Sequence, residues 1–338
     1  MLKLVSYITI GAELEKPIYF DFVNEIDMES AYDNLTDTCK ITIPRNLSLK
    51  GKPIAVGSEA IFKRGMSIKI ELGYDDNLKT VFQGYISHVH LSIPVTLECE
   101  DSMWLLKNNT LDNKSWASVD LKTFLKYIIP SSVSYTTDGF TYENLGKFRI
   151  SNNATSAQCL DTIRKNNNII SFFRNNKLYV GVAFHESLTK TKVFGSEKNV
   201  IDDKSLEWMD RDEVKIKVQG ASVQSNNKVI KYTYPENLLN EKVPTTKLNV
   251  AGISLSQLKK NCKDYYNKFQ YTGYKGSFLT FGEPLINHGD KVGFNSDKLP
   301  ERNDDLYIVK SVKRSFGQGG YRQTIELGQK ITSGEQII

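Results

Sequence analysis

Apolar and polar residues alternate one by one in several short stretches of the first third of the chain. The stretches 39–43, 66–72 and 95–99 each carry an apolar residue at every second position. Side chains on a β-strand point to opposite faces with a period of two, so each stretch is expected to form a strand with one buried and one wet face. Turn-forming residues at 50–53 and 75–77 lie between them. Short strands spaced in this way predict an antiparallel sandwich or barrel.

A change from strands to helices is expected just after this block. The Asp101 carboxylate can accept hydrogen bonds from the first turn of a short helix that starts at Met103 and is broken by the asparagines at 108–109. A longer helix is predicted to begin at Ser118 and to stop at Pro130, because apolar residues recur on one helical face. These apolar residues are Leu121, Phe124, Leu125 and Ile128.

A second helix and a hairpin complete the middle third. Thr155 and Gln158 have the spacing of a capping box, so a helix is predicted to begin there and to end at the asparagine run 166–168. Two strands are predicted at 169–173 and 178–182, joined by four polar residues. The middle third is therefore expected to be a small α+β module.

The last third returns to alternating strands and contains one helix. Strands are predicted at 214–218, at 230–234 and in a closing hairpin over 306–327. Ser254 and Gln257 form another capping box, which predicts a helix with a single apolar face. That face consists of Leu258, Cys262, Tyr265 and Phe269.

These changes of pattern divide the 338-residue chain into parts, as its length also suggests. We expect a β-rich N-terminal domain over 1–108, an α+β domain over 109–198, and a second β-rich domain over 199–330. The second β-rich domain contains the helix, placed at about 254–269. A tail over 331–338 has no clear partner. The coarse similarity of the first and last thirds leaves an internal duplication open.

Composition and charge limit the classes of function that the sequence favours. Lysine and arginine number 44 against 39 acidic residues, a net charge of +5, and both signs are interspersed along the chain. A solvated surface is the favoured interpretation, because a nucleic-acid binder usually shows a concentrated basic stripe. Aromatic residues make up 11% of the chain, which favours strands over helical bundles.

The cysteines and the lengths of the apolar runs indicate the cellular compartment of the protein. The four cysteines stand far apart in apolar surroundings and form no CxxC pair, so buried free thiols in a reducing compartment are expected rather than a zinc site. Residues 1–10 lack the features of a signal peptide, and no run approaches the roughly 18 apolar residues that span a bilayer. Synthesis in the cytoplasm without membrane insertion is therefore expected.

One group of polar residues could hold a metal ion. His88 and His90 lie two residues apart on a predicted strand, and Glu98 and Glu100 have the same spacing on the next one. Together they could form a two-histidine, two-carboxylate site, and the carboxylates could be interpreted as a glycosidase pair. The favoured interpretation is the polar outer face of a sheet, so no metal or catalytic residue is assigned.

Other signatures of an enzyme are missing from the sequence. It contains no GxSxG nucleophile elbow, no phosphate-binding loop and no GxGxxG before a helix. The aromatic and basic segment 271–276 could stack on bases or sugars, although a twisted strand with glycines at its bends is favoured. We therefore expect a protein that is not an enzyme and that binds no cofactor.

Four segments, taken in order, resemble a known family. They are 95–106 (VTLECEDSMWLL), 157–163 (AQCLDTI) with 170–181, 273–285 (GYKGSFLTFGEPL) with 289–292, and 306–327. In this order they resemble the baseplate hub proteins of contractile phage tails, the late-control-D family, to which the hub part of type VI secretion spike proteins is related. The resemblance covers roughly residues 1–330.

The resemblance implies a fold, an assembly and a function. Its fold is mainly β with an α+β insertion, in which two tube-like β-barrel domains flank the small α+β domain. Three copies form a ring that adapts a sixfold tail tube to a threefold spike, so the implied partners are the tail tube, spike and tape-measure proteins. No catalytic residue is implied, and no specific nucleic acid. Because the chain ends at Ile338 without a lysozyme-like domain or needle, a separate spike protein is expected.

Two other functions stay open at this stage. A carbohydrate-binding or cell-wall-degrading tail protein would carry tyrosine and tryptophan side chains on exposed faces. A barrel that binds single-stranded nucleic acid would show an affinity that falls steeply with salt, and the interspersed charge argues against it.

Overall fold

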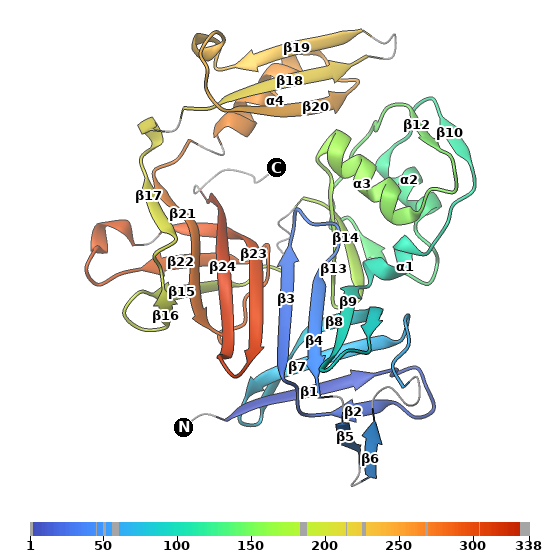
Figure 1. Ribbon diagram of the computed structural model, residues 1–338. Coiled ribbons are helices and arrows are strands. Elements are labelled where there is room, and N and C mark those ends of the chain that lie inside the picture. The colour runs from blue at the N-terminus through green and yellow to red at the C-terminus, as the bar shows by residue number, and fades with distance from the viewer. Residues whose placement is uncertain are drawn as a thin grey trace.

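The computed structural model describes residues 3–44, 46–49, 52–55, 61–182, 188–213, 215–224, 228–267, 270–303 and 305–331. The fold is mainly β, with a large, mostly antiparallel sheet and few helices, as expected (Figure 1). Four sequence-based predictions fall outside the described residues: the strand start at Val214, the helix position Phe269, the first half of the 50–53 turn, and the tail from 332 onward. None of the described helices is long and apolar enough to cross a membrane.

The N-terminal third forms one β-rich block, which we call the first block. Its strands are β1 (Leu4–Ile10), β2 (Ile18–Phe20), β3 (Glu25–Ala31), β4 (Thr38–Ile43), β7 (Ser67–Tyr74), β8 (Asn77–His90) and β9 (Val95–Asp101), with a separate hairpin of β5 (Asn46–Leu49) and β6 (Lys52–Ala55). The predicted alternation is confirmed in β4, β7 and β9, where every second residue is buried.

The last third forms a second block and a smaller unit inserted in it. The second block consists of β15 (Thr191–Gly195), β16 (Val200–Asp202), β17 (Leu206–Met209), β21 (Gly273–Phe281), β22 (Lys291–Asn295), β23 (Leu306–Gly317) and β24 (Gly320–Lys330), with 3-10 turns at Arg211–Glu213 and Pro300–Arg302. The inserted unit consists of β18 (Lys217–Val223), β19 (Val229–Tyr234), β20 (Thr245–Ala251) and α4 (Leu255–Asn267), with a 3-10 turn at Glu236–Leu238. The predicted closing hairpin is confirmed as β23 and β24.

The two blocks are joined through β3 and β23. These strands pair antiparallel over seven residues, from Ala31 with Ser311 to Glu25 with Gly317. The start of β23 pairs with β22 instead, and β24 pairs with β23 as well, so β23 belongs to both blocks. The result is a 14-stranded sheet whose order runs from β16 to β2. Among the described strands this sheet stays open, so neither of the expected tube-like barrels is seen as a closed barrel.

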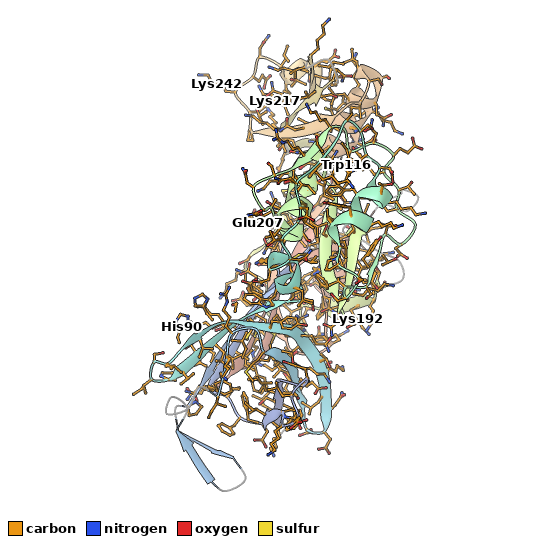
Figure 2. The ribbon with its side chains drawn as sticks, turned by 90° about the vertical axis from the view of Figure 1, so that its right-hand side faces the viewer. His90, Trp116, Lys192, Glu207, Lys217 and Lys242 are labelled. Atoms are coloured by element: carbon orange, nitrogen blue, oxygen red, sulfur yellow. The ribbon has the colours of Figure 1, made fainter. Side chains whose placement is uncertain are left out.

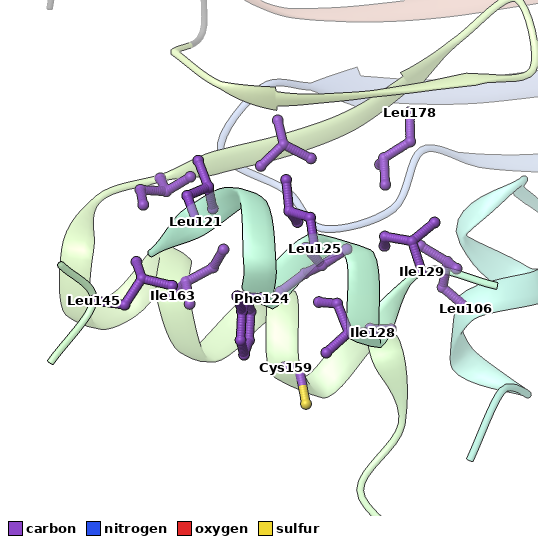
Figure 3. Close-up of a cluster of buried hydrophobic side chains, with 14 of the residues drawn as sticks. Leu106, Leu121, Phe124, Leu125, Ile128, Ile129, Leu145, Cys159, Ile163 and Leu178 are labelled. Carbon is purple, nitrogen blue, oxygen red and sulfur yellow. The ribbon is translucent and has the colours of Figure 1, made fainter. Parts of the chain in front are cut away.

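The middle third is the expected mixture of helices and short strands. It contains α1 (Met103–Lys107), β10 (Lys114–Trp116), α2 (Leu121–Ile128), β11 (Tyr135–Thr136), β12 (Phe148–Ile150), α3 (Ser156–Asn167), β13 (Ile170–Arg174) and β14 (Lys177–Gly181). Figure 3 shows how side chains from α2 and α3 meet in one apolar cluster, with Phe124 and Leu125 fully buried between them. Burying such a side chain stabilises a fold by about 1.5–3 kcal/mol.

Helix starts follow the predicted capping chemistry in part. Thr155 and Gln158 form the complete capping box at α3, and Asn168 ends this helix in the left-handed conformation. Asp101 accepts a hydrogen bond from the Met103 N–H at 3.0 Å, as predicted for α1. At α4 only half of the box forms, because Ser254 accepts from the Gln257 N–H whereas the Gln257 side chain donates to Asn261.

Two predicted element boundaries are wrong. Helix α2 begins at Leu121 rather than Ser118, because the Asp120 carboxylate caps it by accepting from the Thr123 N–H at 2.9 Å. The Ser118 hydroxyl instead lies 2.9 Å from the Asn144 side-chain oxygen. Strand β18 begins at Lys217 and runs to Val223, because its pairing with β20 begins there, so residues 215 and 216 precede the strand to which the prediction assigned them.

Candidate functional site

The histidine and glutamate residues on β8 and β9 do not come together as a metal site. The rings of His88 and His90 stack 5.8 Å apart, and His90 Nε2 lies 3.0 Å from Glu98 Oε1. Glu100 lies opposite Tyr85 in the sheet, and its carboxylate pairs with Lys107 Nζ at 2.5 Å. Among the residues that the structure describes, no group of three or more His, Cys, Asp or Glu side chains is arranged to hold a metal ion. The two carboxylates lie on one sheet surface rather than across a cleft.

The segment 271–276 is packed into the second block instead of forming a stacking surface. Tyr274 is buried and makes an edge-to-face contact with Trp208, with ring centroids 4.9 Å apart. Gly276 has φ +108°, and a Cβ atom at this position would collide with the Ser205 carbonyl oxygen. The glycine is therefore required where β17 crosses close to β21, which agrees with the favoured interpretation of a twisted strand.

The cysteines behave as core residues. All four are free and buried, and Cys39 lies opposite Cys99 where β4 pairs with β9. Burial raises the pKa of the Cys39 and Cys99 thiols above their ordinary value and that of Cys159 to about 11. A thiol reacts through its thiolate, so these cysteines are poor nucleophiles.

A cluster of charged residues that no local sequence pattern predicted lies where the first block, the middle third and the second block meet. We call it the charged junction and define it by Asp37, Asp101, Arg174, His288 and Arg314. Asp101, His288 and Arg314 are buried, whereas Asp37 and Arg174 are partly buried. A cavity of about 90 Å³ lies beside it. The cavity lining includes Ser30 and Asp37 from the first block, Arg174 and Asn176 from the β13–β14 hairpin, and Asn287 and Arg314 from the second block.

Asp37 holds the turn between β3 and β4 against the end of β9. Its carboxylate accepts hydrogen bonds from the Ser30 hydroxyl at 2.6 Å and the Ala31 N–H at 3.3 Å. Its backbone carbonyl accepts from the Asp101 N–H at 3.0 Å. Burial raises the pKa of Asp37 to about 6, because removal from water disfavours the charged form more than these hydrogen bonds favour it.

Asp101 is the second buried carboxyl of the charged junction. Burial raises the pKa of Asp101 well above its ordinary value, and the nearby charge of Asp37 acts in the same direction. Two carboxyls that repel each other in a dry site favour a state in which at least one is protonated. The protonated acid can then donate a hydrogen bond, which a carboxylate cannot do.

Two arginines supply the opposite charge from the other side of the charged junction. Arg314 donates to the Ile286 carbonyl and, at 3.0 Å, to the Asn287 side-chain oxygen, while Arg174 donates to the His288 carbonyl at 2.9 Å. Each arginine therefore donates a hydrogen bond to a backbone carbonyl of the loop before β22. Burial lowers the pKa of both guanidinium groups, and the charge of Asp37 opposes this effect.

His288 lies at the centre of these groups and is fully buried. Its Nε2 atom lies 3.4 Å from Arg174 Nη2 and 3.9 Å from Asp37 Oδ2, and its ring packs edge-on against Phe172. Burial lowers the pKa of His288 well below its ordinary value, and Arg174 and Arg314 add to this effect. The imidazole is thus neutral, with Nε2 able to accept from Arg174.

The geometry of the charged junction is that of a structural contact that holds three parts of the chain together rather than that of a reaction centre. Arg174 of the middle third donates to His288 of the second block, and His288 lies 3.9 Å from Asp37 of the first block. Buried charges are strongly unfavourable when one partner is removed. One residue in the sequence indicates a buried polar site such as the charged junction. Arg314 occupies an inward position of β23, on the same face as Val312 and Phe316, where only an apolar residue would be expected.

Comparison with solved structures shows which proteins share this fold. A tail protein from Neisseria meningitidis MC58 matches at 17% identity with a TM-score of 0.67, covering 97% of each chain. The 43 kDa tail protein of prophage MuSo2 from Shewanella oneidensis matches at 12% identity with a TM-score of 0.62, again over 97% of each chain. An Escherichia coli component of the type VI secretion system matches at 11% identity and a TM-score of 0.55, over 96% of this chain and 77% of that one.

The fold is therefore similar to that of phage tail proteins and of a type VI secretion component, as the four sequence segments suggested. No protein-family model matches the sequence, and no curated protein matches it. At these identities the similarity concerns the fold.

Proposed function

We propose that this chain is a structural hub subunit of a contractile phage tail or a related injection machine. In this role it adapts the sixfold tail tube to a threefold central spike around a channel. The observation that supports the proposal best is the fold similarity to tail proteins along 97% of both chains. The pairing of β3 with β23 adds to it, because this pairing joins the two β-rich blocks of one chain side by side.

The proposed assembly is a ring of three copies. Two blocks per chain give six blocks in a trimer, which matches a sixfold tube at one end and a threefold spike at the other. The sheet ends at β2 on one side and at β16 on the other, and an uncovered strand edge invites further pairing. A head-to-tail contact that closes into a ring covers both ends. Under this proposal each block completes a tube-like barrel domain, with the domains at 1–108, 109–198 and 199–330.

The proposal also assigns partners and a location. The ring would contact the tail tube protein on one side and a spike protein on the other, with the tape-measure protein as a further contact. Made in the bacterial cytoplasm, the chain would then become part of a virion tail or an injection-machine baseplate. The solved structures with a similar fold are a tail protein and a component of the type VI secretion system. This similarity supports a structural role for the chain rather than an enzymatic one.

One observation favours a second candidate, a carbohydrate-binding tail protein. Tyr7 and Tyr19 are 38% and 46% exposed, and their rings stack with centroids 5.9 Å apart on the outer strands β1 and β2. Exposed aromatic rings offer an apolar surface with a polar tip. Binding of peptidoglycan fragments that is lost on Tyr7→Ala and Tyr19→Ala would support this candidate, and the same variants failing to form a ring would support the hub.

Particle size and shape test the proposed hub. We expect light scattering to give the mass of a trimer and negative-stain electron microscopy to show a threefold ring with six lobes and a central hole. The same measurements are repeated with the spike protein present, because the ring can require this partner in order to assemble. A chain that stays monomeric alone and with both tube and spike proteins would contradict the proposal.

A further inference from the structure

Positive charge is concentrated in one small part of the chain. Residues 215–267, which we call the lysine module, contain nine lysines, no arginine and three acidic residues, a net charge of +6 against +5 for the whole chain. The expectation of interspersed charge is therefore wrong for this part. Figure 1 shows the module, with β18, β19, β20 and α4, at one end of the molecule. Lys217 and Lys242 mark the same end in Figure 2, far from His90.

The sheet of the lysine module is covered on one face only. Helix α4 packs on the face that carries Val218 and Gly220, where a Cβ atom on Gly220 would collide with Cys262. Because side chains alternate along a strand and paired residues share a face, the other face follows from the register. We call this the outer face, and it consists of Lys217, Gln219, Ala221, Val223, Val229, Lys231, Thr233, Thr245, Lys247 and Asn249. It contains no acidic residue.

The lysines of the module differ in what they already bind. Lys217 donates to the carbonyls of Leu239 at 3.2 Å and Glu241 at 2.8 Å, so it holds a turn of its own module. Lys231 and Lys247 are exposed on the outer face, and neither ammonium group makes a hydrogen bond or an ion pair within the described parts of the chain. Their ammonium groups are thus directed at solvent, where a partner could replace water.

An apolar pair lies on the same outer face. Val223 and Val229 are paired across β18 and β19 and are 51% and 50% exposed. The tyrosines of the module at 232 and 234 point to the opposite face and pack near α4. The outer face therefore offers no aromatic ring for base stacking. The two valines lie at the hairpin end of this face, with lysines further along the strands. Exposed apolar residues beside charged ones are typical of a protein–protein interface, whereas a phosphate backbone offers no apolar surface for two exposed valines.

We propose that the outer face of β18, β19 and β20 docks a protein surface in which carboxylates surround a small apolar patch. The carboxylates pair with Lys231 and Lys247, and the apolar patch covers Val223 and Val229. Charge complementarity of this kind speeds association and selects the partner more than it raises affinity. The docking goes beyond the hub role, because the face is separate from the β3–β23 pairing that joins the two blocks.

Peptide probes on the full-length chain test the docking. One fluorescent peptide consists of glutamate and serine, a second carries two central leucines in place of serines, and a duplex DNA of equal charge is the third probe. We expect the leucine peptide to bind most tightly, by roughly fivefold over the first peptide, since burying apolar side chains adds to the charge attraction. Val229→Ser should remove this advantage.

Matched charge reversals separate a site from general attraction. Lys231→Glu with Lys247→Glu should weaken binding of the leucine peptide by roughly tenfold or more, whereas Lys260→Glu with Lys263→Glu on the exposed side of α4 should change it by less than about twofold. Glutamine replacements repeat the test if the reversals disturb folding, which circular dichroism reports. Equal losses in both pairs, no loss in the first pair, or tighter binding of DNA than of the leucine peptide would each overturn the proposal. Ring formation is measured separately, so the fate of the hub proposal does not decide this one.

Discussion

Arg174 donates a hydrogen bond to the backbone carbonyl of His288 at 2.9 Å, and this bond ties the β13–β14 hairpin of the middle third to the loop before β22. The two residues come from parts of the chain that have separate apolar clusters. The bond is partly buried in the charged junction, beside the cavity that Arg174 lines. The arrangement of the three parts is therefore expected to depend on a few buried polar contacts.

Replacing Arg174 tests this dependence. Arg174→Met should lower the free energy of unfolding by about 3 kcal/mol, because it removes the positive charge near Asp37 and leaves the His288 carbonyl without its donor. Urea unfolding followed by tryptophan fluorescence measures the change. Lys165→Met is the matched control, since Lys165 pairs with Asp161 on the surface of α3 and such exposed pairs contribute less than about 1 kcal/mol. Equal small effects of both variants would show that the charged junction does not hold the parts together.

The raised pKa of Asp37 predicts a dependence of stability on pH. The folded state holds the proton of this carboxyl up to about pH 6, above the ordinary value of 3.8. Its contribution to stability is therefore fully present below pH 3.8 and is lost as pH rises through 6. The lowered pKa of His288 acts oppositely, because the folded state disfavours its protonation and stability rises with pH up to its ordinary 6.5.

The two effects can be separated by substitution. Asp37→Asn should remove the loss of stability between pH 4 and 6 and leave the effect of His288 in place. The midpoint of thermal unfolding of this variant should therefore rise more steeply with pH than that of the unchanged protein. Thermal unfolding at half-unit steps of pH measures this. Parallel curves for the two proteins would mean that Asp37 titrates normally in the folded state.

Gly220 is expected to be essential for the packing of α4 on its sheet. Gly220→Ala would place a methyl group against the Cys262 sulfur and within 2.9 Å of Leu258, and overpacking of this kind costs about 1–3 kcal/mol. Gly319→Ala is the control, because nothing lies within 4 Å of a Cβ atom there. Limited proteolysis should cut the lysine module of the first variant faster than that of the second. Equal cutting rates would show that the helix can shift to admit the methyl group.

Two hydroxyl residues before helices should respond differently to removal of their side chains. Thr155→Ala should cost about 1 kcal/mol, because it removes the cap of α3, whereas Ser118→Ala should be nearly neutral. Denaturant midpoints measure both changes. A larger loss at Ser118 than at Thr155 would mean that the contact of Ser118 with Asn144 matters more than the cap.

Local chemistry explains which parts of the fold could be predicted from the sequence. Strand alternation in β4, β7 and β9 and the capping box at Thr155 depend on neighbouring residues, and these predictions are confirmed. Ser118 fits the pattern of a cap because serine precedes an apolar helical pattern, but Asp120 lies closer and its carboxylate is a stronger acceptor for the first-turn N–H groups. Two residues with similar local signals compete, and only the backbone path decides between them.

Features that depend on distant residues could not be predicted in the same way. The charged junction combines Asp37, Arg174 and Arg314, which no local pattern connects. The pairing of β3 with β23 is also invisible in a local pattern, and it turns two expected barrels into one open sheet. The concentration of lysine in residues 215–267 was present in the sequence, but its meaning depends on knowing that α4 covers only one face of the module's sheet.

The pairing of β3 with β23 also has a consequence for protein synthesis. Glu25 leaves the ribosome long before its partner Gly317, because the two residues are far apart in the sequence. Until then one edge of β3 has no strand beside it, and such an edge is a template for aggregation. A transcript or translation product that is cut short before β23 would keep this edge permanently open. Synthesis of β23 thus serves as a checkpoint, since only a product that contains this strand can cover the open edge of β3.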